Sequence, residues 1–395
     1  MRGFLLGLVV VSSSVGWIAS SAQAGAIEGF EVGAQTGLGY DSNMFNTPSS
    51  GPSSRYDALS NETTVKGKYK NWLTKRLRSK SGLGLTSSYR YADSDAQAWK
   101  LQVKAGTGLE WKMFGMKKKE DPFRPAGKLG LALAYAGTFN PTLDNPSPFD
   151  DENDIDDQDE IDDLLEDDAA FDGLDEDFFD LDEGDADDDG DWDTDSEGED
   201  DSYFDEDPLS GKFFNNKANR NIFSPALAFN LRPTKPMSLT FAANYALGVI
   251  QQIDPTKPSS DFQQVGGAVK WRQHIVPKIL DLAADFGFGY RWWDEKTAPS
   301  GALLESWPMS WGVGAKVRPI KRLKLLASYR YGLRIVPINS PSDGWQHIGR
   351  VGVQWKIAKG WHVFEDNSFL YSGIQDNSSR DAFRFQMIAG LRWNI

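Results

Sequence analysis

The chain has 395 residues, no cysteine and 38 glycines, and its aromatic residues are 23 Phe, 14 Trp and 12 Tyr. The absence of cysteine excludes disulfide scaffolds, cysteine-ligated metals and thiol catalysis. The formal charge of -15 is unevenly spread, because residues 144 to 207 hold 35 of the 57 acidic residues and no Lys or Arg. The rest of the chain therefore carries 42 basic against 22 acidic residues, a balance of +20.

Residues 1 to 24 have the features of a secretory signal peptide. Arg2 gives a positive start, Phe4 to Val11 form an apolar run, and Ala22-Gln23-Ala24 is an A-x-A cleavage site. An uncleaved anchor helix is the alternative, but the apolar run is short and is interrupted by Ser12 to Ser14. We therefore expect cleavage and a mature chain that begins near Gly25.

Beyond residue 24 there is no run of about 18 apolar residues of the kind that a transmembrane helix needs. A second way of crossing a membrane remains, because a closed β-barrel also pairs all of its backbone N–H and C=O groups internally. Each strand of such a barrel needs only about 10 residues of alternating hydrophobicity.

Alternation of this kind recurs along the whole chain and is clearest from Trp99 to Trp111 and from Leu280 to Trp292. In both segments every second residue is apolar or Thr, as in a strand with one apolar face. The pattern predicts 14 strands, over residues 30 to 40, 60 to 72, 77 to 91, 97 to 111, 126 to 139, 221 to 231, 237 to 249, 262 to 272, 279 to 293, 306 to 318, 322 to 335, 345 to 357, 360 to 371 and 381 to 393. Pro225 and Pro308 fall inside two of these runs, where a missing N–H is expected only near strand ends or bulges.

The expected connections alternate in length. Short ones, rich in Pro, Lys and Arg, cover residues 73 to 76, 232 to 236, 273 to 278, 319 to 321 and 358 to 359. Longer ones cover residues 41 to 59, 140 to 220, 250 to 261, 294 to 305, 336 to 344 and 372 to 380. This asymmetry is typical of outer-membrane barrels, which have tight periplasmic turns and long outer loops, although 92 to 96 and 112 to 125 depart from it.

The sequence thus predicts an all-β fold, a transmembrane antiparallel up-and-down β-barrel of about 14 strands. Residues 25 to 139 would form its first part with strands 1 to 5, residues 140 to 220 an acidic and largely disordered extracellular loop, and residues 221 to 395 strands 6 to 14. A secreted β-sandwich or lipocalin-like barrel would show the same alternation with its apolar face inward. Long strands, aromatics at both strand ends and many long charged side chains on the polar face favour a lipid-facing apolar side.

Both ends of the predicted barrel resemble known sequence features. The segment from Gly390 to Ile395, with Phe385, Trp393 and the terminal Ile395, resembles the G-x-x-Φ-x-Φ end of the signal that the barrel assembly machinery reads. It departs from that signal because Ile388 stands where a polar residue is expected and because most such barrels end in Phe or Trp.

Near the other end, Tyr40-Asp41-Ser42-Asn43-Met44-Phe45 resembles the Y-D-S-N-x-F segment of a loose group of porin-like Gram-negative outer-membrane β-barrel proteins. Ordinary turn chemistry is the alternative explanation for Asp-Ser-Asn. The resemblance implies the barrel fold and an outer-membrane location in a Gram-negative bacterium, and it implies no particular solute.

The acidic segment contains one pattern that metal ions could use. Its residues 185 to 190 match D-x-D-x-D-G of an oxygen-rich calcium loop, but Ser196 occupies the twelfth position, where the bidentate Glu would stand. The candidate ligands are Asp185, Asp187, Asp189, Asp191 and Asp193. In a run so rich in Asp, we expect weak collective binding of Ca²⁺ or Mg²⁺ in preference to a specific site, and we expect no other cofactor.

Basic residues gather on the polar face of the predicted strands. They are Lys66, Lys68, Lys70, Lys100, Lys104, Lys128, Arg291, Lys316, Arg330, Arg334, Arg350, Lys356, Arg384 and Arg392. A water-filled lumen with this excess attracts anions, which makes a porin-like channel for small anionic solutes the first hypothesis. The alternative is a structural or export-associated barrel, for example in surface-polysaccharide secretion, whose Lys and Arg pair with Glu110, Asp281, Asp285 and Asp366 to brace the wall.

Other function classes fit less well. The three histidines, His274, His347 and His362, show no recognisable catalytic partner pattern, so we expect no enzyme. Nucleic-acid binding is disfavoured by the expected compartment. The expected partners are outer-membrane lipid and lipopolysaccharide, the barrel assembly machinery and small anionic solutes.

The opposite charges of the acidic segment and the barrel generate one further hypothesis, in which the segment acts as a salt-sensitive plug at the mouth. Deletion of residues 144 to 207 should then change conductance, anion preference and their salt dependence in planar-bilayer recordings. Unchanged values of all three would contradict the plug.

Overall fold

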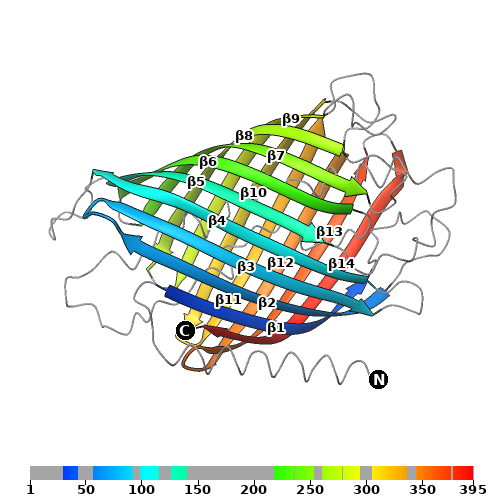
Figure 1. Ribbon diagram of the computed structural model, residues 1–395. Helices are drawn as coiled ribbons and strands as arrows, with labels where there is room; N and C mark the ends of the chain where they lie inside the picture. The colour runs from blue at the N-terminus through cyan, green and yellow to red at the C-terminus, as the bar shows by residue number, and fades with distance from the viewer. Residues whose placement is uncertain are drawn as a thin grey trace.

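The computed structural model describes residues 30–42, 57–91, 98–114, 126–139, 218–234, 236–252, 260–277, 279–293, 305–335, 344–374 and 377–394. These residues form 14 antiparallel strands that close into one barrel (Figure 1). The strands are β1 (Phe30–Ser42), β2 (Asp57–Trp72), β3 (Leu77–Tyr91), β4 (Ala98–Phe114), β5 (Ala126–Phe139), β6 (Ala218–Thr234), β7 (Met237–Gln252), β8 (Ser260–Val276), β9 (Leu280–Trp293), β10 (Glu305–Ile320), β11 (Leu323–Ile335), β12 (Gly344–Ala358), β13 (Trp361–Ile374) and β14 (Asn377–Asn394). Within the described ranges, no helix is long and apolar enough to cross a membrane.

The topology is up-and-down, because each strand pairs with its neighbours in sequence. The last pairing, from Gly33 opposite Asn394 to Asp41 opposite Gln386, joins β1 to β14 and closes the barrel. The predicted fold class and the 14 strands are confirmed. Several strands are longer than predicted, and β14, which begins at Asn377, extends four residues further back than expected. The predicted signal peptide and residues 140 to 217 lie outside the described residues.

The two faces of the sheet differ sharply in polarity. Leu83, Leu131 and Val313 belong to the exposed set and keep 60%, 58% and 58% of their surfaces exposed. The alternate positions carry buried polar side chains such as Ser88 and Gln264. The apolar face therefore points away from the barrel and the polar face points into it, which is opposite to a secreted barrel or sandwich with an apolar interior.

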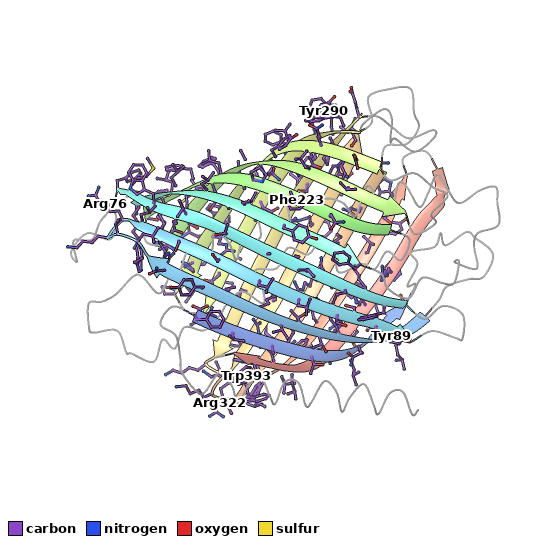
Figure 2. The ribbon with its side chains drawn as sticks, in the orientation of Figure 1. Arg76, Tyr89, Phe223, Tyr290, Arg322 and Trp393 are labelled. Carbon is purple, nitrogen blue, oxygen red and sulfur yellow. The ribbon has the colours of Figure 1, made fainter. Side chains whose placement is uncertain are left out.

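One end of the barrel carries tight connections of two to four residues, after β2, β6, β8, β10 and β12. Arg76 and Arg322 mark this end in Figure 2. Their carbonyl groups accept hydrogen bonds of 2.8 Å from the N–H groups of Lys112 in β4 and Lys356 in β12. In the two-residue turn before β13, Gly360 has φ of 70°, which favours glycine.

Several predicted connections on this side are shorter than expected, because the preceding strands extend into them. Residues 232 to 234 belong to β6, and residues 273 to 276 belong to β8. His274 was predicted to lie in a turn, but it lies in a strand. The ladder between β8 and β9 extends the strand, because His274 pairs with Asp281 in register. The sequence pattern predicted the strand to end before this point, because the polar residues Gln273 and His274 are consecutive and break the alternation.

Pro225 and Pro308 lie inside strands, and neither of these two residues coincides with a register shift. At Pro225 the β6–β7 pairing is interrupted between Phe223 and Ala226 and resumes in the same register. The Tyr245 carbonyl, which would face the missing N–H, instead accepts a hydrogen bond of 3.3 Å from the Ser224 hydroxyl. A neighbouring side chain thus replaces the backbone donor, so the proline needs neither an end nor a bulge.

This substitution of donors can be tested by a double-mutant cycle. Ser224→Ala should destabilise the barrel by about 1 to 3 kcal/mol, because the Tyr245 carbonyl loses a half-buried hydrogen bond. In a Pro225→Ala background the backbone N–H is restored, so Ser224→Ala should then have a much smaller effect. Urea unfolding of the refolded protein in lipid vesicles measures both values, and equal costs in the two backgrounds would contradict the mechanism.

Candidate functional site

The inner face of the barrel is strongly basic. All 14 basic residues expected on the polar face occupy inner strand positions, alternating with the exposed apolar residues. By the same alternation, further inner basic residues are Arg78, Lys80, Lys112, Arg232, Lys270, Arg272, Arg318 and Lys324. The acidic residues at inner positions whose side chains are described are Glu31, Glu62, Glu110, Asp281, Asp285 and Asp366. Basic side chains therefore outnumber acidic ones on the described inner face.

Lysines gather on the inner face of β2, β3 and β4. This lysine wall consists of Lys66, Lys68, Lys70, Lys80, Lys100 and Lys104. Glycines occupy inner positions among them on β3 and β4. A methyl group on Gly84 would lie 3.8 Å from Lys66 Cγ and 3.9 Å from Lys104 Cβ, and one on Gly82 would meet only the Gly67 carbonyl oxygen, at 3.8 Å. The sheet thus leaves space above the glycines into which the lysine side chains can move.

Arginines gather on the inner face of β9, β11, β12 and β14. This arginine wall consists of Arg291, Arg330, Arg334, Arg350, Arg384 and Arg392, and all six are buried. Arg291 shows how such a side chain is held, because its Nε donates to Gln264 Oε1 at 2.7 Å and its guanidinium lies 4.7 Å from the centre of the Phe262 ring. In a closed barrel of 14 strands β3 lies opposite β10, so the lysine wall faces the barrel side that contains β9 and β11.

Some inner charges are paired across strands. Glu110 contacts three cations, with distances of 3.0 Å to Arg78, 3.0 Å to Lys80 and 3.4 Å to Lys128. This network joins β3, β4 and β5 and leaves an excess of positive charge. The sequence interpretation missed Arg78 and Lys80 as members of the inner face, although the alternation that identified Lys100 also includes them.

Two residues of the arginine wall have acidic partners on neighbouring or nearby strands. Arg330 lies 2.8 Å from Asp285, and Arg350 Nε donates to both carboxylate oxygens of Asp366, at 2.8 and 2.9 Å. These pairs support a bracing role for the two arginines, as in the alternative considered from the sequence. The half-buried lysines Lys66, Lys68 and Lys104 are more exposed than these two arginines.

The histidines lie at three separate places. His274 Nδ1 is 2.5 Å from Asp281 at an inner position near the end with tight connections, a pair that the sequence did not reveal. His347 faces outward among aromatic rings, with Nδ1 2.6 Å from the Tyr329 hydroxyl. His362 is buried on the inner face of β13. The structure brings none of the three histidines into contact with another.

Two other predicted sites are only partly described. The acidic candidates for calcium, residues 185 to 193, lie outside the described residues, and the described ranges contain no group of three or more His, Asp or Glu that could hold a metal ion. Of the predicted assembly signal, Phe385 lies beside Phe369 with its ring tilted, Trp393 lies near Trp361, and Gly390 pairs with Gly37. Ile395 lies outside the described residues.

No protein-family model matches the sequence, and no curated protein matches it. Solved structures with a similar overall path include an outer-membrane protein, OmpT of Vibrio cholerae, at 9% identity and a TM-score of 0.40 over 93% of this chain and 99% of that chain. An outer membrane channel from Pseudomonas putida F1 has 11% identity and a TM-score of 0.41 over 94% and 97% of the two chains. An anion-selective porin from Comamonas acidovorans has 8% identity and a TM-score of 0.39 over 93% and 98%. Because identity and superposition are low, the fold rests on the strand order and register given above.

The Glu110 network and the exposed Lys70–Glu31 pair form a matched test of inner charge pairing. Glu110→Gln should destabilise the barrel by about 3 to 5 kcal/mol, because three buried or half-buried cations lose their shared anion. Glu31→Gln should cost at most about 1 kcal/mol, because the Lys70–Glu31 pair is exposed to water. Urea unfolding in vesicles compares the two variants, and equal small losses would show that the network does not brace the wall.

Proposed function

We propose that this protein spans the outer membrane of a Gram-negative bacterium and conducts small anionic solutes through a basic lumen. The observation that carries the proposal is the combination of an apolar outer face with an inner face on which basic residues outnumber acidic ones. An apolar exterior and a polar interior are the arrangement of membrane channels built from strands. A low-dielectric wall strengthens the attraction of a basic lumen for anions.

The outer face also carries aromatic residues near both ends of the barrel, where the two membrane interfaces would lie. Aromatic rings cluster near the end with long connections, where the rings of Tyr290 and Trp307 are 4.7 Å apart and those of Trp345 and Tyr371 are 4.9 Å apart. At the other end, the rings of Trp361 and Trp393 lie 6.3 Å apart. Figure 2 shows Tyr290 and Trp393 at opposite ends of the barrel exterior. Trp and Tyr at two heights favour a belt at each membrane interface, with lipopolysaccharide around the outer one.

The lysine wall is the part of the lumen that we assign to solute contact. A lysine carries its charge on a flexible stem, so it can follow an anion along the wall without a fixed geometry. The glycines beside Lys66 and Lys104 leave room for that movement. The arginines of the arginine wall are buried, which favours a structural role for them in bracing the barrel wall.

A planar-bilayer experiment tests the proposal. The refolded wild-type protein should conduct, and its reversal potential in a salt gradient should indicate preference for the anion. The triple variant Lys66→Glu, Lys68→Glu, Lys104→Glu should lower the anion-to-cation permeability ratio by about tenfold or more, because six units of charge change at the lumen wall.

The matched control is Lys75→Glu, Arg76→Glu, Lys321→Glu, which makes the same charge change in exposed turns at the barrel end. Its permeability ratio should stay close to that of the wild type at high salt, where exposed charges are screened. Equal ratios for the two triple variants would contradict solute passage along the lysine wall.

A sealed structural or export-associated barrel is the second candidate, and the buried Arg330–Asp285 and Arg350–Asp366 pairs favour it. Such pairs stabilise a wall without any solute. A refolded protein that inserts into liposomes but gives no conductance would support this candidate and would exclude the channel.

A further inference from the structure

The outer face of β13 carries a carboxylate in the middle of the apolar belt. Glu365 and Asn367 alternate with the inward-facing His362, Phe364 and Asp366, and both therefore point outward. Along the same outer row lie Trp361 and Val363 on one side and Phe369 and Tyr371 on the other. Because the pair lies midway between the aromatic residues of the two interfaces, a spanning barrel places it near the centre of the bilayer.

This position is exceptional among the described strands. Every Lys and Arg in them whose side chain is described occupies an inner position, so no outer cation is available to pair with Glu365. The other outer acidic residues whose side chains are described, Asp261 and Glu305, stand near the ends of β8 and β10. Glu365 has a hydrogen-bond partner on its own strand, because Asn367 Nδ2 donates to Glu365 Oε1 at 3.0 Å. Ionisable residues at membrane depth are costly and mark functional contacts.

Further polar groups lie on the outer face of β1 and β2, beyond the β1–β14 pairing that closes the barrel. The cross-strand row that begins at Glu365 runs through Ala389 and Leu38 to Asn61. Beside it, the outward Thr36 and Thr63 hydroxyl groups are 3.1 Å apart. We call this set the polar outer patch, and it comprises Glu365, Asn367, Thr36, Asn61 and Thr63.

A different part of the outer face, on β9, β10 and β11, is aromatic. On β9, β10 and β11 the outer face is covered by rings, with Phe286 and Trp311 5.6 Å apart and Trp311 and Tyr331 also 5.6 Å apart. A bilayer that surrounded the barrel evenly would favour apolar side chains at every outer position of the same depth. The difference between these two parts of the outer face, with a carboxylate at mid-depth in one of them, favours a contact of the polar outer patch with something other than lipid.

We propose that the polar outer patch is the contact surface for a second copy of this chain, with the carboxyl group of Glu365 in one copy accepting hydrogen bonds from the patch of the other. This inference rests on the membrane-spanning placement proposed above. It is independent of whether the lumen conducts.

The geometry of a membrane favours a second copy as the partner. The bilayer fixes the depth and the direction of each barrel, so two copies related by an axis along the membrane normal bring groups of equal depth together. The patch contains an acceptor in Glu365 and donors in the Asn367 amide and the threonine hydroxyl groups, so it is complementary to itself. Polar side chains that hydrogen-bond between membrane segments associate them where apolar residues cannot. The small side chain of Ala389, between β13 and β1, allows two sheets to approach closely.

Disulfide trapping in lipid vesicles tests the contact, and the chain is suited to it because it has no cysteine of its own. Ala389→Cys in the full-length protein, at low protein-to-lipid ratio, should give a covalent dimer under mild oxidation. The matched control is Ala327→Cys, an outward alanine on β11, on the aromatic side of the barrel. It should give little dimer.

A second variant separates a specific contact from random collision. Glu365→Leu with Asn367→Leu, combined with Ala389→Cys, should reduce trapped dimer by about tenfold, because the polar contacts are lost. The substitutions place apolar side chains against lipid, so the barrel should fold at least as well as the wild type, and heat-dependent gel mobility checks this. The control substitution Val313→Leu, on the outer face of β10 and away from the polar outer patch, should leave dimer formation unchanged.

The outcomes distinguish this inference from the channel proposal. Equal trapping of Ala389→Cys and Ala327→Cys, or no effect of the leucine substitutions, overturns the dimer even if conductance and anion preference are observed. Conversely, specific trapping in a protein that shows no conductance supports the dimer and contradicts the channel. Flotation of the vesicles with the protein verifies the membrane placement on which both depend.

Discussion

The requirement that every backbone N–H and C=O group of the strands find a partner governs this structure. A sheet of 14 strands would have two open edges, and the pairing of β1 with β14 removes both. The seam is narrow, because a methyl group added to Gly390 would lie 2.0 Å from the Thr36 carbonyl oxygen. A glycine is therefore needed where the first and last strands meet. Once the seam closes, each residue is assigned to the inside or the outside of the barrel.

That assignment sorts the charges. Every described strand Lys and Arg lies on the inner face, and only a few acidic residues accompany them. Basic side chains inside a low-dielectric wall attract anions, and this attraction is the basis of the proposed passage of anionic solutes. The burial of the residues divides the excess further. The arginine wall is buried and partly bound to carboxylates and amides, whereas several lysines of the lysine wall remain half-buried beside glycines. In the proposed function, the arginine wall therefore braces the barrel and the lysine wall contacts the solute.

Period-two alternation is a local property, and for this reason the sequence predicted the strands well. Residues 77 to 91 and 126 to 139 were predicted with the bounds that β3 and β5 have. The inner position of the lysines followed from the same alternation. The cross-strand contacts did not follow, because the three cations around Glu110 and the His274–Asp281 pair depend on the register between strands, which a single sequence does not reveal. Pro225 was expected to mark an end or a bulge for a similar reason, since the hydroxyl of Ser224 that replaces its donor acts only through the pairing with Tyr245.

Departures from the alternation carry information of a different kind. An apolar side chain on the inner face, such as Phe364 or Ile388, is accommodated by packing against its neighbours, and the two belong with Leu326 to one buried cluster. A polar side chain on the outer face has no equivalent solution within one barrel, because its neighbours are apolar and the surrounding medium offers no hydrogen bonds. Glu365 can satisfy part of its need through Asn367, two residues away on the same face. In the proposed dimer, a second copy supplies the remaining hydrogen bonds of the Glu365 carboxylate. It can do so because the bilayer holds identical chains at the same depth and so brings the same groups to the same height.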